Sequence, residues 1–161
     1  MILIRPMLIW PAVLLVILFA SINVDANVGV TVEKISEAGL DELVRSRNDK
    51  MVITFMAAWC GPCIDELPVL NKLYQKYKPQ GLNLIGISID LEGPKAMQPF
   101  LDKYQVNFPV YWVGEKAVSE LNIYGIPMLM LVKDGEILEK IVGKRSRRFL
   151  DKTISNFLKS K

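Results

Sequence analysis

Residues 50–63 read KMVITFMAAWCGPC, and this stretch decides the fold. Its first part, residues 51–58, is an almost unbroken apolar run, which is typical of a β-strand buried on both faces. Cys60 and Cys63 follow at once, and Pro62 between them suits the first turn of a helix. The stretch therefore predicts a buried strand that leads directly into a helix, with two cysteines at the junction.

The position of Cys60 at a helix N-terminus has a chemical consequence. Unpaired amide groups and the helix dipole favour negative charge there, so we expect a lowered pKa and a nucleophilic thiolate near neutral pH. Cys63 lies about one turn further on and is expected to be shielded from solvent. With two residues between them, the cysteines can cycle between dithiol and disulfide, and the absence of a cation or histidine between them favours a reducing role. The alternatives are a structural disulfide and half of a zinc site.

Composition excludes several other kinds of chemistry. The chain has 161 residues, no histidine, two cysteines and a net charge of +3. These numbers exclude histidine-dependent triads and a four-cysteine metal site within one chain, and the net charge is too small to argue for nucleic acid. No metal, cofactor or nucleic acid is therefore expected. Residues 144–148, KRSRR, are interpreted as a solvated turn, with an acidic partner or lipid headgroups as alternatives.

Residues 1–26 read as an export signal rather than as part of the fold. Arg5 precedes the uncharged stretch 7–20, and Val24 and Ala26 suit cleavage by a signal peptidase. The alternative is an uncleaved membrane anchor, since residues 7–24 are at the lower limit of length for crossing a bilayer. Either interpretation places residues 27–161, as one domain, in the periplasm or cell envelope.

Strands and helices are expected to alternate through the rest of the chain. We predict strands over residues 28–34, 50–58, 82–89, 108–113, 128–133 and 137–142, and helices over 36–47, 61–77, 94–104, 116–121 and 149–158. Asp134 and Gly135 are a strong signal for a two-residue hairpin between the last two strands. This order predicts an α/β fold with a central mixed sheet, parallel in the middle and antiparallel at one edge, flanked by helices.

Two motifs resemble the thioredoxins. Residues 59–63, WCGPC, resemble the thioredoxin active site, and residues 124–127, YGIP, together with the later hairpin resemble the second half of the fold. The likeness is closer to the exported TlpA/ResA-like branch, because of the export segment and residues 93–113, an extra helix and strand that small thioredoxins lack. The resemblance covers about residues 33–158 and implies a thioredoxin fold and dithiol–disulfide exchange.

The resemblance also implies where a substrate would bind. It implies that Pro127 is cis and faces the cysteines, with the backbone of Ile126 available to a substrate peptide. Trp59 precedes the nucleophile and is expected to be exposed beside it. The residues expected to contact substrate are Trp59, Gly61, Pro62 and Ile126.

The proton acceptor for Cys63 is less obvious. Thr54 stands where small thioredoxins carry a buried aspartate, and it cannot act as a base. Met56 stands where a tryptophan is usual. Glu66, one helical turn after Cys63, is the candidate substitute, with a simple helix-dipole role as the alternative.

The sequence thus predicts an exported thiol–disulfide oxidoreductase. Cys60 would attack a disulfide in a partner protein and Cys63 would resolve the mixed disulfide. The resemblance implies envelope proteins as substrates, with apocytochrome c the leading candidate, and a membrane thiol electron carrier as donor, since the chain has no NADPH-binding motif. A general envelope oxidant or isomerase, and a non-catalytic binding module with a static disulfide, remain as alternatives.

Overall fold

The computed structural model describes residues 29–45, 50–114, 118–119 and 121–160. The expected export segment lies outside these residues, as does part of the helix predicted over 116–121. Among the described residues, no helix has the length and apolar character needed to cross a membrane.

A six-stranded sheet forms the centre of the molecule, with the strand order β1-β4-β3-β2-β5-β6. The strands are β1 (Glu33–Lys34), β2 (Lys50–Met56), β3 (Asn83–Ser88), β4 (Val110–Trp112), β5 (Met128–Lys133) and β6 (Glu136–Val142). The first four in sequence pair in parallel, whereas β5 is antiparallel to β2 and β6 is antiparallel to β5. The predicted mixed sheet with an antiparallel edge is confirmed.

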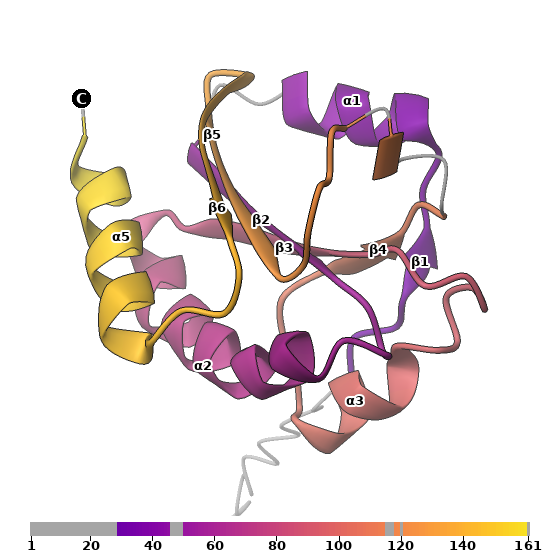
Figure 1. Ribbon diagram of the computed structural model, residues 1–161. Coiled ribbons are helices and arrows are strands. Elements are labelled where there is room, and N and C mark those ends of the chain that lie inside the picture. Colours follow the sequence, from indigo (N-terminus) through magenta and orange to yellow (C-terminus); the bar gives the residue numbers. More distant parts are fainter. Residues whose placement is uncertain (1–28, 46–49, 115–117, 120, 161) are drawn as a thin grey trace, which may run out of the picture.

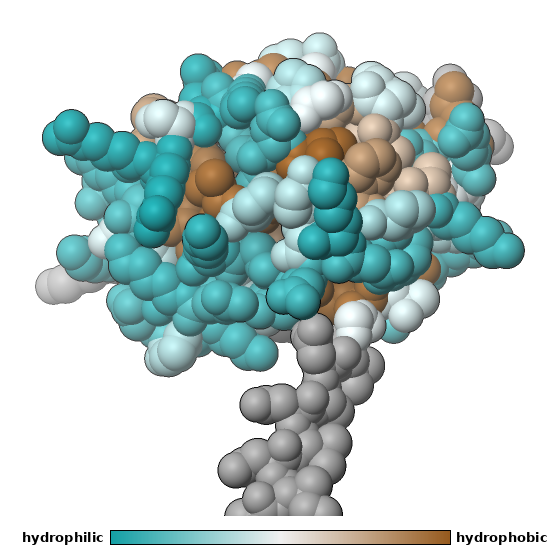
Figure 2. All heavy atoms as spheres, turned by 90° about the horizontal axis from the view of Figure 1, so that it is seen from below, coloured by the Kyte–Doolittle hydropathy of each residue, from teal (hydrophilic) through white to brown (hydrophobic). Residues whose placement is uncertain are grey.

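Helices cover both faces of this sheet. They are α1 (Glu37–Arg45), α2 (Gly61–Tyr77), the 3₁₀ turn η1 (Lys78–Gln80), α3 (Gln98–Lys103) and α5 (Arg147–Lys159). In Figure 1, α2, α3 and α5 lie on one side of the sheet and α1 lies on the other. Figure 2 views the molecule from below and shows a mostly hydrophilic surface with smaller apolar patches. Coverage on both faces explains why β2 and β3 are almost entirely apolar.

The predicted extra helix and strand are present as α3 and β4, but the helix begins later than expected. It begins at Gln98 rather than at Pro94, which lies in a preceding turn. A helix from residue 94 would place Pro99 well inside it, where the missing N–H removes a backbone hydrogen bond and the ring clashes with the preceding turn. With the helix beginning at Gln98, Pro99 falls in the first turn, where it is tolerated.

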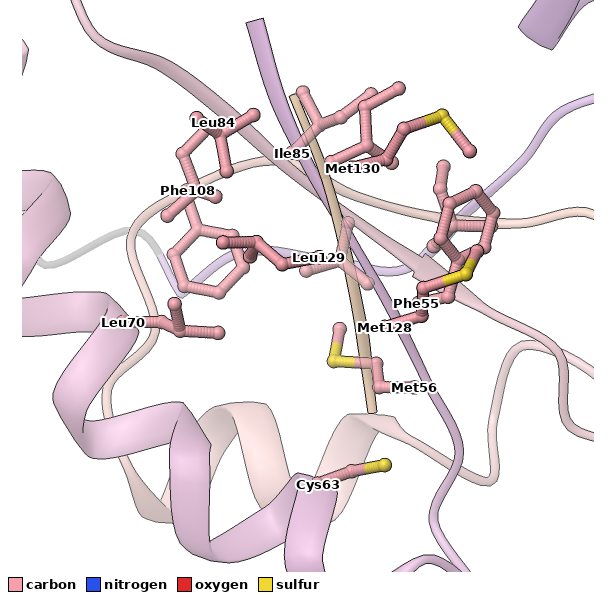
Figure 3. Packing of buried hydrophobic residues seen from close by; sticks show 14 of the residues in the cluster. Phe55, Met56, Cys63, Leu70, Leu84, Ile85, Phe108, Met128, Leu129 and Met130 are labelled. Atoms are coloured by element: carbon pink, nitrogen blue, oxygen red, sulfur yellow. The ribbon is translucent and has the colours of Figure 1, made fainter. Parts of the chain in front are cut away.

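The core brings the two halves of the chain together beneath the cysteines. Figure 3 shows Leu70 of α2, Leu84 of β3 and Leu129 of β5 in one cluster, with Met56 and Cys63 at its lower end. Gly86 leaves room for this packing, because a Cβ there would lie 2.6 Å from Cε of Met56. Met56 therefore fills the space between the strands above Cys63 (Figure 3).

Candidate active site

The two cysteines form a disulfide at the junction of β2 and α2, with an S–S distance of 2.07 Å. Cys60 is the N-cap residue of α2, and its Sγ accepts a hydrogen bond from the N–H of Cys63 at 3.2 Å. Pro62 occupies the first turn. Cys63 is 2% exposed and Cys60 is 6% exposed. The structure therefore places both cysteines at the helix N-terminus, with Cys63 the more shielded.

A buried carboxyl group holds the loop that leads to Cys60. Asp90 lies two residues after the end of β3 and is 1% exposed. Its Oδ1 accepts a hydrogen bond from the N–H of Ala58 at 2.8 Å, and its Oδ2 accepts one from the hydroxyl of Ser88 at 2.7 Å. The indole N–H of Trp112 donates to its carbonyl at 2.7 Å. Asp90 thus fixes the backbone two residues before the first cysteine.

The sequence reasoning did not single out Asp90, although a signal was present. An acidic residue directly follows an apolar run, residues 82–89, that predicts a buried strand. Neighbouring parallel strands present their carboxyl ends at the same edge of a sheet, where functional residues gather. The strand before Cys60, β2, and the strand before Asp90, β3, are such neighbours.

The motif at residues 124–127 lies at this same edge of the sheet. The Ile126–Pro127 peptide bond is cis, as the resemblance implies. Met128, the next residue, pairs with Phe55 near the end of β2, and Figure 3 shows Met128 at the same end of the sheet as Met56 and Cys63. The carbonyl of Pro127 accepts a hydrogen bond from the N–H of Gly143 at 2.8 Å. Pairing with β2 therefore brings Pro127 to the end of the sheet that carries the cysteines.

An apolar groove of about 520 Å³ opens beside the disulfide. Trp59, Leu91 and Tyr124 line it and are 66%, 69% and 70% exposed. Ile126 lines it as well. The structure thus joins two residues expected to contact substrate, Trp59 and Ile126, in a single groove. Gly61 and Pro62 are exposed at the beginning of α2.

The side chain of Glu66 is buried and accepts a hydrogen bond from the loop between β6 and α5. The residue is 4% exposed, and its Oε1 accepts a hydrogen bond from the backbone N–H of Arg145 at 2.7 Å. Burial raises the pKa of Glu66, while the Arg145 N–H and the charges of Lys144 and Arg145 oppose this effect. Glu66 is therefore a buried carboxyl group, one helical turn from Cys63, whose pKa is raised above its ordinary value.

Known protein families and curated proteins include relatives of this chain. The sequence model of the AhpC/TSA family matches residues 26–139. The chain belongs to the AhpC/TSA family. A curated relative, the thiol-disulfide oxidoreductase ResA of Bacillus cereus (strain ZK / E33L), is 33% identical over 112 residues, which cover 68% of this chain and 64% of ResA. The matched region thus spans less than two thirds of the length of that relative.

Solved structures place this AhpC/TSA chain among proteins with the thioredoxin fold. A thiol:disulfide interchange protein of the thioredoxin family from Chlorobium tepidum is 22% identical with a TM-score of 0.62, covering 73% of this chain and 84% of its own. A secreted disulfide oxidoreductase of Mycobacterium tuberculosis, homologous to E. coli DsbE, is 20% identical with a TM-score of 0.63, covering 82% and 98%. The predicted thioredoxin fold is confirmed.

The site of this AhpC/TSA chain combines a disulfide with a groove at the protein surface. A disulfide at a helix N-terminus lies beside an open apolar groove, with one buried carboxyl group a helical turn away. In the described part of the chain, no three His, Cys, Asp or Glu side chains lie close enough together to hold a metal ion. What the described side chains can supply is an exchangeable sulfur pair, a proton-binding group and a surface for a polypeptide.

Proposed function

We propose that the chain is a thiol–disulfide oxidoreductase that reduces disulfides in proteins of the cell envelope. The observation that carries this proposal is the Cys60–Cys63 disulfide at the N-cap of α2. Membership of the AhpC/TSA family and similarity to a ResA thiol-disulfide oxidoreductase support it. The open groove beside the disulfide supports a polypeptide substrate, because its exposed aromatic and aliphatic side chains suit an extended segment.

The reaction begins with the reduced protein. The thiolate of Cys60, favoured by the N-terminus of α2, attacks one sulfur of the substrate disulfide. An Sγ–S bond forms to Cys60, the substrate S–S bond breaks, and the departing substrate sulfur leaves as a thiolate that takes a proton from solvent. The substrate is now held to Cys60 by a mixed disulfide.

Resolution uses the second cysteine. The thiol of Cys63 loses its proton and attacks Sγ of Cys60, so that the intramolecular disulfide forms and the second substrate sulfur leaves as a thiolate and is protonated. Two electrons pass to the substrate. A membrane thiol electron carrier, itself oxidised from dithiol to disulfide, would then return the Cys60–Cys63 pair to the dithiol.

Other side chains assist these two steps. We assign Glu66 as the group that accepts the proton of Cys63, because it lies one helical turn away and burial raises its pKa toward the range useful for proton transfer. Pro127 and Ile126 present a strand end to the substrate, and Trp59, Gly61 and Pro62 form the surface around the disulfide.

The cellular setting of the proposal rests on the sequence. Residues 1–26 read as a signal peptide or an anchor, so we place the reaction in the periplasm or cell envelope. Resemblance to the TlpA/ResA-like branch supports apocytochrome c as the substrate.

Three measurements test the proposal. The reduced full-length chain should reduce a disulfide-containing protein, and Cys60→Ser should abolish this activity. Cys63→Ser should accumulate mixed disulfides on Cys60, from which envelope substrates can be identified. Unchanged activity of Cys60→Ser would show that the disulfide is static, and a reduction potential near that of strong oxidants would favour the oxidant alternative.

A further inference from the structure

A cluster of cations lies beside the proposed redox site and has no part in the chemistry described above. It consists of Lys144, Arg145, Arg147 and Arg148, which are all exposed, and we call it the basic rim. Residues 143–146 connect β6 to α5, and Arg147 and Arg148 begin α5. The basic rim is the dense cationic run KRSRR of the sequence.

Two backbone hydrogen bonds fix the basic rim next to the site. The N–H of Gly143, directly before the rim, donates to the carbonyl of Pro127 at 2.8 Å. The N–H of Arg145 donates to Oε1 of Glu66 on α2 at 2.7 Å. The rim is therefore attached to α2 through Arg145, and the residue directly before the rim is attached to Pro127. A polypeptide lying over the cysteines and the proline would pass close to it.

Acidic groups of the protein only partly neutralise the basic rim. Nζ of Lys144 lies 2.8 Å from Oδ2 of Asp65, a pair in which both side chains are at least half exposed. Arg145 lies near the buried Glu66. Asp151, on the next turn of α5, is near Arg147 but is already bound by Lys76 at 2.7 Å. Arg147 and Arg148 therefore present positive charge to solvent.

Helix stability does not account for this charge. Ser146 caps α5 and accepts the N–H of Phe149, and the first turn contains no acidic residue. Arg147 and Arg148 stand at the first two helical positions, where the helix dipole disfavours cations. The helix dipole opposes positive charge at these two positions, so a role in binding accounts for the arginines better than helix stability does.

We propose that the basic rim binds carboxylate side chains next to the disulfide of the substrate protein, so that the preferred substrates are proteins with acidic residues flanking the attacked cysteine. This inference rests on the proposed reductase function. Complementary charge beside the reacting sulfurs raises the rate of productive encounter and fixes the orientation of the bound segment. An acidic polypeptide is favoured over a lipid surface because Gly143, directly before the rim, is hydrogen-bonded to Pro127, which would present a strand end to the substrate chain.

The test uses three peptides with the same disulfide and length, flanked by Glu, Gln or Lys. For the reduced full-length chain we expect kcat/KM to be about tenfold higher for the Glu peptide than for the Lys peptide at low salt. The preference should shrink as added salt screens the charges. The double variant Arg147→Glu/Arg148→Glu should abolish or invert the preference. Lys159→Glu, which reverses one charge at the far end of α5 where the double variant reverses two, should leave it unchanged.

Reduction of the Gln peptide distinguishes failure of the proposed reductase function from failure of the charge preference. If the wild type does not reduce the Gln peptide, the proposed function itself fails. If the wild type and the double variant reduce the Gln peptide equally, the double variant is folded and active. Negative charge is favourable at a helix N-terminus, so these substitutions should not destabilise α5. Equal wild-type rates on all three peptides, or a preference that survives the double substitution, would overturn the proposal. Loss of binding to phosphatidylglycerol vesicles in the double variant, with no wild-type preference among peptides, would overturn it in favour of a membrane surface.

Discussion

Replacement of Asp90 by alanine should both destabilise the fold and loosen the active-site loop. The carboxyl group of Asp90 accepts two hydrogen bonds in a buried setting, from the N–H of Ala58 and the hydroxyl of Ser88. Hydrogen bonds to charged groups contribute about 1.5–3 kcal/mol each, and a buried donor left without a partner is costly. Allowing for water entering the space, we expect the free energy of unfolding to fall by about 2–4 kcal/mol.

Urea unfolding of the oxidised protein, followed by circular dichroism, measures this change. Asp90→Asn should cost about 1 kcal/mol, because an amide keeps the shape and one acceptor. Glu92→Ala removes an exposed carboxyl group from the same loop and should stay within about 0.5 kcal/mol of the wild type. The substitutions Asp90→Ala and Ser88→Ala should not be additive, because the two residues share a hydrogen bond.

Activity gives the second half of the test. Ala58 is two residues before Cys60, so a released loop should misplace the nucleophile and slow disulfide reduction by about tenfold under conditions where Asp90→Ala is still folded. A stability equal to that of Glu92→Ala would refute the energetic argument. A destabilised variant with a wild-type rate would refute the claim that Asp90 positions the loop.

Three further results are expected. Gly86→Ala should lower the free energy of unfolding by about 1–3 kcal/mol, because the added Cβ would lie 2.6 Å from Cε of Met56, and urea unfolding measures this change. Burial raises the pKa of Glu66 above its ordinary value of 4.5, so ionisation is disfavoured in the folded state and stability should fall as pH rises from that value through the folded-state pKa. Glu66→Gln should remove this part of the pH dependence. If the free energy of unfolding varied with pH in the same way in both proteins, Glu66 would make no such contribution and the prediction would be wrong. In the reduced protein, iodoacetamide at neutral pH should alkylate Cys60 at least about tenfold faster than Cys63, as read by mass spectrometry, whereas comparable rates would count against a favoured thiolate at the helix N-terminus.

The sequence predicted those features whose signals are local. The apolar run before Trp59 is β2, and Cys60 begins the helix that was expected there. The hairpin expected at Asp134 and Gly135 joins β5 to β6, and both residues have positive φ, 52° and 79°, as a tight hairpin of this type requires. Each of these predictions depends on neighbouring residues alone.

Features set by distant contacts were predicted less well. The first strand was expected over residues 28–34, but within the described residues it is limited to Glu33–Lys34. Upstream of it, the N–H of Val32 donates to the side chain of Gln98, whose amide donates to the carbonyl of Val30. The side chain of Gln98 thus takes the place of a neighbouring strand as the hydrogen-bond partner of this segment. The alternation of apolar and polar residues in the sequence cannot reveal such a contact. The Asp90 contacts escaped prediction for the same reason.

The pairing of β2 with β5 sets an order of events during synthesis of the chain. Met51 pairs with Val132, so the strand that leads to the cysteines acquires its antiparallel neighbour only after most of the chain has been made. Until then Cys60 and Cys63 are attached to a sheet without Pro127 or the loop that binds Glu66. Such long-range pairing is slow to form. A chain ending before Met128 would therefore carry both cysteines without the pairing of β2 to β5 and without the loop that binds Glu66.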